Sequence, residues 1–144
     1  MQVQIRDLQT LPTDRNLLGD AARAALAVAG GALDALDIAI VDDRRIREIN
    51  RAYRNSDYAT DVIAFEAEDG PAGRCGEVIV SAQTALRQAT EAGHSLQAEL
   101  CLLVAHGVLH VLGYEDYDRH SRATMNQLQQ RVLAMLGERL DRHE

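Results

Sequence analysis

The sequence predicts an α+β fold, in which a small mixed β-sheet of about four strands packs with about five helices. Strand-like and helix-like segments alternate irregularly along the chain, and one helical segment is apolar on every side. The chain has 144 residues, 47% of them hydrophobic, and no internal repeat or linker, which suits one domain over residues 1–144. The apolar helix should lie at its centre, because a helix without a polar face is buried.

The first half of the chain is expected to form two strands and two helices. The strands show polar–apolar alternation or a short apolar run. The helices follow aspartates that can accept hydrogen bonds from the first backbone N–H groups, and the first helix stops at two glycines. These elements are a strand around Val3 and Ile5, a helix over Asp14–Ala29, a strand over Leu36–Val41, and a helix from Asp42 and Asp43 to about Arg54.

The second half is expected to form two more strands and three helices. Turn residues separate the strands, and Gly93 and Gly113 end two of the helices. The last helix shows an apolar stripe at spacings of 3, 4 and 4 residues, from Met125 to Leu136. The elements are strands over Asp61–Glu66 and Glu77–Val80, and helices over Ser81–Ala92, from Ser95 through Leu112, and from near Asp118.

Composition limits the function. The net charge is −7, so the molecule as a whole is not an obvious nucleic-acid binder. All 15 basic residues are arginine, whose planar guanidinium can grip a phosphate with two hydrogen bonds. Any binding of RNA must therefore come from a local basic patch.

The segment at the start of the chain has no export signal, and no apolar run reaches the ~18 residues that a membrane helix needs. The two cysteines, Cys75 and Cys101, are far apart in the sequence and do not suggest a disulfide framework. We expect a cytoplasmic protein without membrane contact.

His106 and His110 are the strongest functional signal. They are spaced i, i+4 and share one face of the apolar helix. Two buried imidazoles are costly without partners, and a metal ion satisfies both nitrogens at once. The alternative is two unrelated core histidines, each hydrogen-bonded to a backbone carbonyl. The ligand spacing favours a catalytic metal.

Gly113 follows this helix and allows the chain to turn back through Tyr114, Glu115 and Asp116 toward the histidines. Metzincin proteases also have two helical ligands, a glycine turn and a third ligand. They carry a glutamate base directly after the first histidine, however, and here that position is Gly107. A protease mechanism of that kind loses its base.

Three blocks of the sequence resemble the YbeY family of bacterial rRNA-maturation endoribonucleases. HGVLHVLGYED (residues 106–116) resembles the signature H-G-x-L-H-L-x-G-Y-D-H. INRAYRNSDYATDVIAFE (residues 49–66) resembles L-N-x-x-Y-R-x-x-D-x-P-T-D-V-L-S-F-P, and GEVIVS (residues 76–81) resembles G-D-[IV]-x-[IL]. The order and spacing of the blocks agree with the family.

The resemblance implies a metal-dependent endoribonuclease that cleaves single-stranded RNA in 16S rRNA 3′-end maturation and ribosome quality control. One divalent metal, usually taken to be zinc, would be held by His106 and His110, and Arg54 matches a motif arginine. The implied partners are the 16S rRNA precursor, the small ribosomal subunit and its associated factors.

The third ligand departs from the family pattern, because Asp116 stands where the family has histidine. Since Met125 keeps its place downstream, we interpret this as a substitution and expect Asp116 to be the third ligand. Such a site should acidify a bound water less and shift selectivity toward harder metals such as manganese. His120 is the alternative ligand. Smaller departures are Ala59 and Glu66 for proline, Ala64 for serine and Glu115 for aspartate.

Four arginines form a stripe on the helix after residue 42, with spacings of 3, 4 and 3: Arg44, Arg47, Arg51 and Arg54. They fall on one face, whereas Ile46, Ile49 and Tyr53 lie opposite and are expected in the core. The stripe is either a track for the RNA backbone or an ordinary solvated face. The resemblance favours a catalytic role for Arg54, and Arg44, Arg47 and Arg51 are candidate RNA contacts.

Arg54 would hold a phosphate and offset charge in the transition state. The general base is left open, and the nucleophile is either a water or the RNA 2′-hydroxyl. Two other functions are considered: a ribosome-associated factor whose metal is structural, and a metallopeptidase, which the absence of the glutamate disfavours.

Overall fold

The computed structural model, which describes residues 1–142, confirms the predicted α+β class. Its elements, in chain order, are β1 (Gln2–Asp7), α1 (Arg15–Ala29), β2 (Ala35–Val41), α2 (Asp43–Arg54), β3 (Val62–Gly70), β4 (Gly73–Ser81), α3 (Ala82–Ala92), α4 (Leu96–Val111) and α5 (Arg119–Asp141). None of the helices in this range is long and apolar enough to span a membrane.

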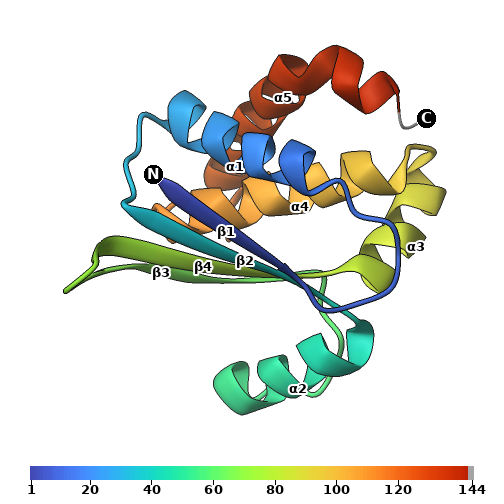
Figure 1. Ribbon diagram of the computed structural model, residues 1–144, viewed down its shortest axis with the longest axis horizontal. Helices are drawn as coiled ribbons and strands as arrows, with labels where there is room; N and C mark the ends of the chain where they lie inside the picture. Colours follow the sequence, from blue (N-terminus) through green and yellow to red (C-terminus); the bar gives the residue numbers. More distant parts are fainter. Residues whose placement is uncertain (143–144) are drawn as a thin grey trace.

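The four strands form one mixed sheet in the order β1-β2-β4-β3. The pairs β1–β2 and β2–β4 are parallel, and β3 runs antiparallel to β4. Helices α1, α4 and α5 lie on one side of the sheet and α2 lies on the other (Figure 1). Alternate residues of β2 therefore enter two separate cores: Ile38 and Ile40 join the large one, and Ala39 and Val41 join the small one under α2.

Helix α4 is the predicted central helix. It contacts α1, α3, α5, β3 and β4, and most of its residues are buried. The helix approaches the sheet closely at Gly107, where an added Cβ would lie 2.5 Å from Cγ1 of Val78. At Gly76 of β4, an added Cβ would collide with Val111 of α4. Small residues on both surfaces therefore hold the end of α4 that carries the histidines against the sheet.

Strands β3 and β4 extend beyond the predicted segments and form a hairpin. Gly70 pairs with Gly73 around a two-residue turn, and the pairing shifts between Phe65 and Glu68. Figure 1 shows the tip of this hairpin projecting past the helices. Because the residues near the tip cover no core, they lack the apolar alternation from which the rest of the strands was predicted.

The prediction that Tyr53 belongs to the core is wrong. Along α2, Ile46 is fully buried and Ile49 is partly buried, but Tyr53 is 71% exposed. The small core is too short to cover the whole helix. The ring of Tyr53 instead packs against the ring of Phe65 in a T-shaped arrangement, with ring centroids 5.7 Å apart.

Candidate metal centre

His106 and His110 lie near the C-terminal end of α4 and point their Nε2 atoms toward each other. The two Nε2 atoms are 3.0 Å apart, and each side chain is about one-quarter exposed. The i, i+4 spacing places both imidazoles on one face, as predicted. Helix α4 packs against other helices and the sheet, which holds the backbone that carries the two histidines in place.

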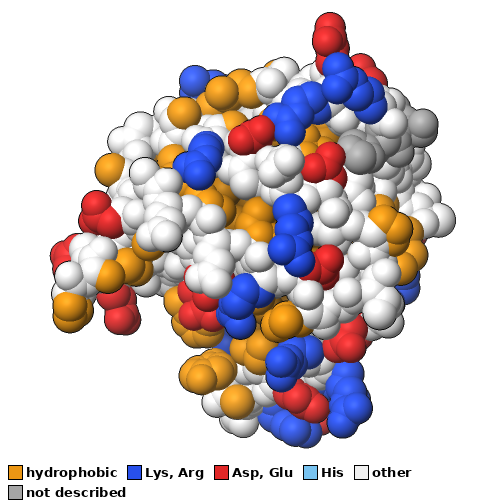
Figure 2. All heavy atoms as spheres, viewed as in Figure 1, with side chains coloured by type: hydrophobic (Ala, Val, Ile, Leu, Met, Phe, Trp, Pro, Cys, Tyr) orange, Lys and Arg blue, Asp and Glu red, His pale blue; other side chains and the backbone are white. Residues whose placement is uncertain are grey.

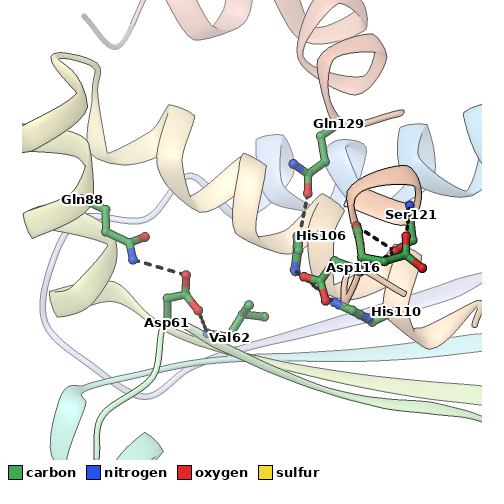
Figure 3. Close-up of polar contacts among 9 residues, drawn as sticks. Asp61, Val62, Gln88, His106, His110, Asp116, Ser121 and Gln129 are labelled. Atoms are coloured by element: carbon green, nitrogen blue, oxygen red, sulfur yellow. Dashed lines mark hydrogen bonds and ion pairs between the residues drawn. The ribbon is translucent and has the colours of Figure 1, made fainter. Parts of the chain in front are cut away.

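The chain turns sharply after α4 and brings Asp116 back to the histidines. Gly113 adopts φ +98°, a conformation that favours glycine, and its N–H donates to the carbonyl of His110. Oδ2 of Asp116 then lies 3.3 Å from Nε2 of His106 and 3.5 Å from Nε2 of His110 (Figure 3). The carboxylate that caps α5 belongs to Asp118, which leaves Asp116 available for the histidines.

The three donor atoms fit a divalent metal. Their separations of 3.0, 3.3 and 3.5 Å are close to the value of about 3.3 Å between ligands of a tetrahedral zinc with bonds of about 2.0–2.1 Å. Two imidazole nitrogens and one carboxylate oxygen are ordinary zinc donors, and three protein ligands leave one position open, as in catalytic zinc sites.

His120 does not join this group. It lies exposed in the first turn of α5, and within residues 1–142 the only cluster with metal-ligand spacing is formed by His106, His110 and Asp116. Of the two candidates for a third ligand, the structure brings Asp116 to the histidines.

A pocket of about 370 Å³ opens beside the three donor atoms. Arg54, which the resemblance matches to a motif arginine, lines this pocket from the end of α2. Three further carboxylates also line it, and the sequence analysis did not assign them a role: Asp61, Glu66 and Glu115. Glu66 and Glu115 both stand at departures from the family pattern, which was the available signal.

The pocket is strongly anionic without a cation. Four carboxylates and one guanidinium line it, which gives a formal charge of −3 with neutral histidines. Such a surface attracts a divalent cation and repels a phosphate. A phosphate group would therefore be easier to accommodate after a metal has reduced this charge.

Asp61 is already engaged in hydrogen bonds. Its Oδ1 accepts from the N–H of Val62 at 2.8 Å, and its Oδ2 accepts from Nε2 of Gln88 at 3.3 Å (Figure 3). These bonds hold the start of β3 beside α3 and leave the exposed Glu66 and Glu115 as the freer carboxylates of the pocket.

The arginine stripe divides into two groups. Arg44 pairs with Glu48 at 3.5 Å, and Arg47 donates two hydrogen bonds to Asp57, at 2.8 and 3.2 Å, while Arg51 lies 4.0 Å from the same carboxylate. The hydrogen bond from Arg47 lowers the pKa of Asp57. Arg54 has no ion pair within the described part of the chain, and it alone of the four lines the metal pocket.

The structure shows why the glutamate base of metzincins would not fit at Gly107. The position that carries glutamate in metzincins faces the sheet here, and even a Cβ would collide with Val78. A glutamate at this position would have to displace the sheet, so the close packing of α4 excludes the zincin arrangement.

Gln129 is a site residue that the sequence analysis missed. It is 7% exposed on α5, and its Oε1 lies 2.6 Å from Nδ1 of His106 (Figure 3). The available signal was a polar residue four positions after Met125 and three before Val132, within the apolar stripe of the last helix.

Together, the fold and this centre define a small α+β protein with a candidate mononuclear metal site at the end of a buried helix. The sequence model of the Endoribonuclease YbeY family matches residues 7–137. The chain therefore belongs to the YbeY endoribonuclease family.

Relatives with the name Endoribonuclease YbeY match most of the chain. That of Moorella thermoacetica is 42% identical over 133 residues, covering 85% of this chain and 84% of the relative. That of Heliobacterium modesticaldum is 38% identical over 136 residues, covering 84% and 82%. That of Desulforamulus reducens is 37% identical over 150 residues, covering 95% and 98%.

The fold is also similar to a solved structure. The solution structure of TM1509 from Thermotoga maritima superimposes with a TM-score of 0.60 and 25% sequence identity, covering 92% of this chain and 91% of that one. The similarity extends over nearly the whole molecule and agrees with the family assignment.

Proposed function

We propose that this chain is a metal-dependent endoribonuclease that cleaves single-stranded RNA during 16S rRNA 3′-end maturation and ribosome quality control. One observation carries the proposal: a member of the YbeY endoribonuclease family brings His106, His110 and Asp116 to metal-ligand distances in a pocket that Arg54 also lines.

One divalent ion, zinc in the first instance, is the proposed cofactor, held by His106, His110 and Asp116. It would supply Lewis acidity toward the scissile phosphodiester. The carboxylate among the ligands supports a site that also accepts harder ions such as manganese.

Arg54 is the proposed catalytic cation. Its guanidinium pairs with no carboxylate of residues 1–142 and lies at the pocket, so it can bind a non-bridging phosphate oxygen and stabilise the charge that develops there. Of the carboxylates at the pocket, Glu66 and Glu115 can accept a proton from the attacking hydroxyl or water more readily than Asp61, which already accepts two hydrogen bonds.

The proposed path of the RNA backbone runs from the pocket along the exposed side of α2, past Arg51, Arg47 and Arg44. Figure 2 shows blue arginine side chains over α2 at the bottom of the view, mixed with red acidic ones. Binding there should be weak, because Glu48 and Asp57 already neutralise part of the charge. The small ribosomal subunit is the proposed place of action, in the cytoplasm.

Cleavage of a labelled single-stranded RNA by the zinc-loaded protein, compared with His110→Ala, tests this function. We expect cleavage by the wild type, little cleavage of the same sequence in a duplex, and at least a hundredfold loss in the variant. Equal cleavage by both proteins would identify a contaminating nuclease and contradict the proposal. A 2′,3′-cyclic phosphate on the product would identify the 2′-hydroxyl as nucleophile.

The same assay separates the two other functions. Tight zinc binding without cleavage by the wild type would favour a factor whose metal is structural. A metallopeptidase is disfavoured because the close contact of Gly107 with the sheet leaves no room for a glutamate base. Turnover of a peptide by the pure protein would support that function instead.

A further inference from the structure

Among residues 1–142, Gln129 is the one residue outside the pocket lining whose side chain forms a hydrogen bond with a proposed metal ligand. It reaches His106 from α5, 23 positions later in the chain. The second proposed helical ligand, His110, has no such support, because among residues 1–142 its side chain pairs only with His106 and Asp116. The metal centre is thus anchored to α5 through one hydrogen bond.

The direction of this hydrogen bond determines the tautomer of His106. A carbonyl oxygen only accepts, so Nδ1 of His106 must carry the proton that it donates to Oε1 of Gln129. A neutral imidazole protonated at Nδ1 has its lone pair at Nε2, the atom that faces His110 and Asp116. The bond therefore sets both the orientation of the ring and the form that binds a metal.

We propose that Gln129 is a positioning residue of the metal centre, which fixes His106 as an Nε2 ligand and keeps the ligand set at a single negative charge. This inference rests on the proposed metal site. An amide accepts the bond without adding charge, whereas a carboxylate at this place would make the imidazole more basic and the bound ion less electrophilic. Compared with a carboxylate at this place, Gln129 thus keeps the bound ion more electrophilic, although the ion is bound less tightly.

Gln97 provides a matched control. It is also a glutamine with 7% exposure, and its side chain also makes short hydrogen bonds, accepting from the N–H of Asp14 at 3.0 Å and donating to the carbonyl of Pro12 at 2.8 Å. These bonds tie α4 to the segment before α1 and do not involve a proposed metal ligand. Loss of Gln97 should affect stability without affecting metal binding.

The test measures zinc affinity of the metal-free proteins by competition with a chromogenic chelator, and thermal unfolding in the presence of a chelator. We expect Gln129→Met to weaken zinc binding about 10–100-fold, Gln97→Met to leave the zinc Kd within about twofold while lowering the unfolding temperature, and Gln129→Glu to bind zinc at least as tightly as the wild type. A merely structural role for Gln129 would not produce the recovery in Gln129→Glu.

Wild-type affinity in Gln129→Met, equal losses in Gln129→Met and Gln97→Met, or failure of Gln129→Glu to recover would each overturn the inference. If Gln129→Met does not fold, Gln129→Asn, which withdraws the carbonyl from Nδ1, takes its place with the same expected weakening. RNA cleavage is scored separately, so an inactive wild type that binds zinc through Gln129 would contradict the proposed function alone. A wild type that binds no zinc would contradict both.

Discussion

Arg54 differs from the other arginines of its stripe in what surrounds it. Arg44, Arg47 and Arg51 lie next to carboxylates, whereas Arg54 lies at the metal pocket without an ion pair in the described residues. Spacing along the helix could not distinguish the four residues, because their partners lie partly in the loop after α2. The resemblance to the family separated Arg54 from the rest.

Arg54→Gln should lower kcat for RNA cleavage about 10²–10³-fold, because a cation that stabilises developing phosphate charge is lost. Arg45→Gln is the matched control, because Arg45 is exposed on the same helix but belongs neither to the stripe nor to the metal pocket lining, and it should change kcat by less than about threefold. Single-turnover cleavage of one RNA by both variants checks this. Equal losses would mean that α2 acts only as a diffuse basic surface.

At Gly107, we expect alanine to destabilise the protein although it favours helix formation. Alanine is favoured over glycine inside a helix by about 1 kcal/mol, but a Cβ here would lie 2.5 Å from Val78. Gly107→Ala should therefore lower the free energy of unfolding by about 1–3 kcal/mol. Urea unfolding measures it.

Gly19 in α1 is the control, because a Cβ there meets Ile5 at an ordinary 3.7 Å. Gly19→Ala should be neutral or stabilising. In the double variant, Val78→Ala should restore part of the unfolding free energy that Gly107→Ala removes. A stabilised Gly107→Ala would show that α4 does not pack against the sheet as described.

At the level of elements, the N-terminus of α2 is tied to the start of α3 through Asp43. This carboxylate accepts hydrogen bonds of 2.6 Å from Ser81 and from Thr84, and it pairs with Arg87 at 2.9 Å. Partial burial alone would raise the pKa of Asp43, but these three partners together lower it below its usual value. The sequence predicted Asp43 only as part of a helix cap.

Asp43→Asn should cost about 1–3 kcal/mol of unfolding free energy at pH 7, where the carboxylate is charged. Because its pKa is lowered in the folded state, Asp43 contributes its stability above the unfolded pKa of about 3.9, and the contribution is lost as pH falls through the folded value. Urea unfolding at pH 7 and near pH 3 should show a difference from the wild type that shrinks at the lower pH. A difference independent of pH would contradict this role.

Elements were predictable where their residues face a core. The helix caps, the wholly apolar run of α4 and the apolar stripe of α5 are local signals, and the helices begin and end close to the expected residues. The tip of the β3–β4 hairpin and the exposure of Tyr53 depend on where the sheet and the helices stop covering each other. No local pattern carries that information.

At the scale of the whole molecule, the metal centre is assembled from segments that the sequence alone does not bring together. His106, His110 and Asp116 are near neighbours in the chain and were predictable from helical spacing and a glycine turn. Gln129, Asp61 and Glu66 reach the same place only through the packing of α4 against α5 and β3. Their roles could be recognised only in the folded chain.

The chain combines a net charge of −7 with an anionic pocket, so the proposed metal is central to the whole account. The large core does not involve the ligands, and we expect the metal-free protein to stay folded. Its unfolding temperature should then rise with zinc concentration, by mass action on a preformed site.

The most direct test is a titration of the metal-free protein with zinc while bound metal and RNA cleavage are measured together. The account predicts that cleavage rises and saturates at one zinc per chain, and that neither His110→Ala nor Asp116→Ala shows this saturable site. Full cleavage by the metal-free protein, or a full zinc complement in Asp116→Ala, would contradict it.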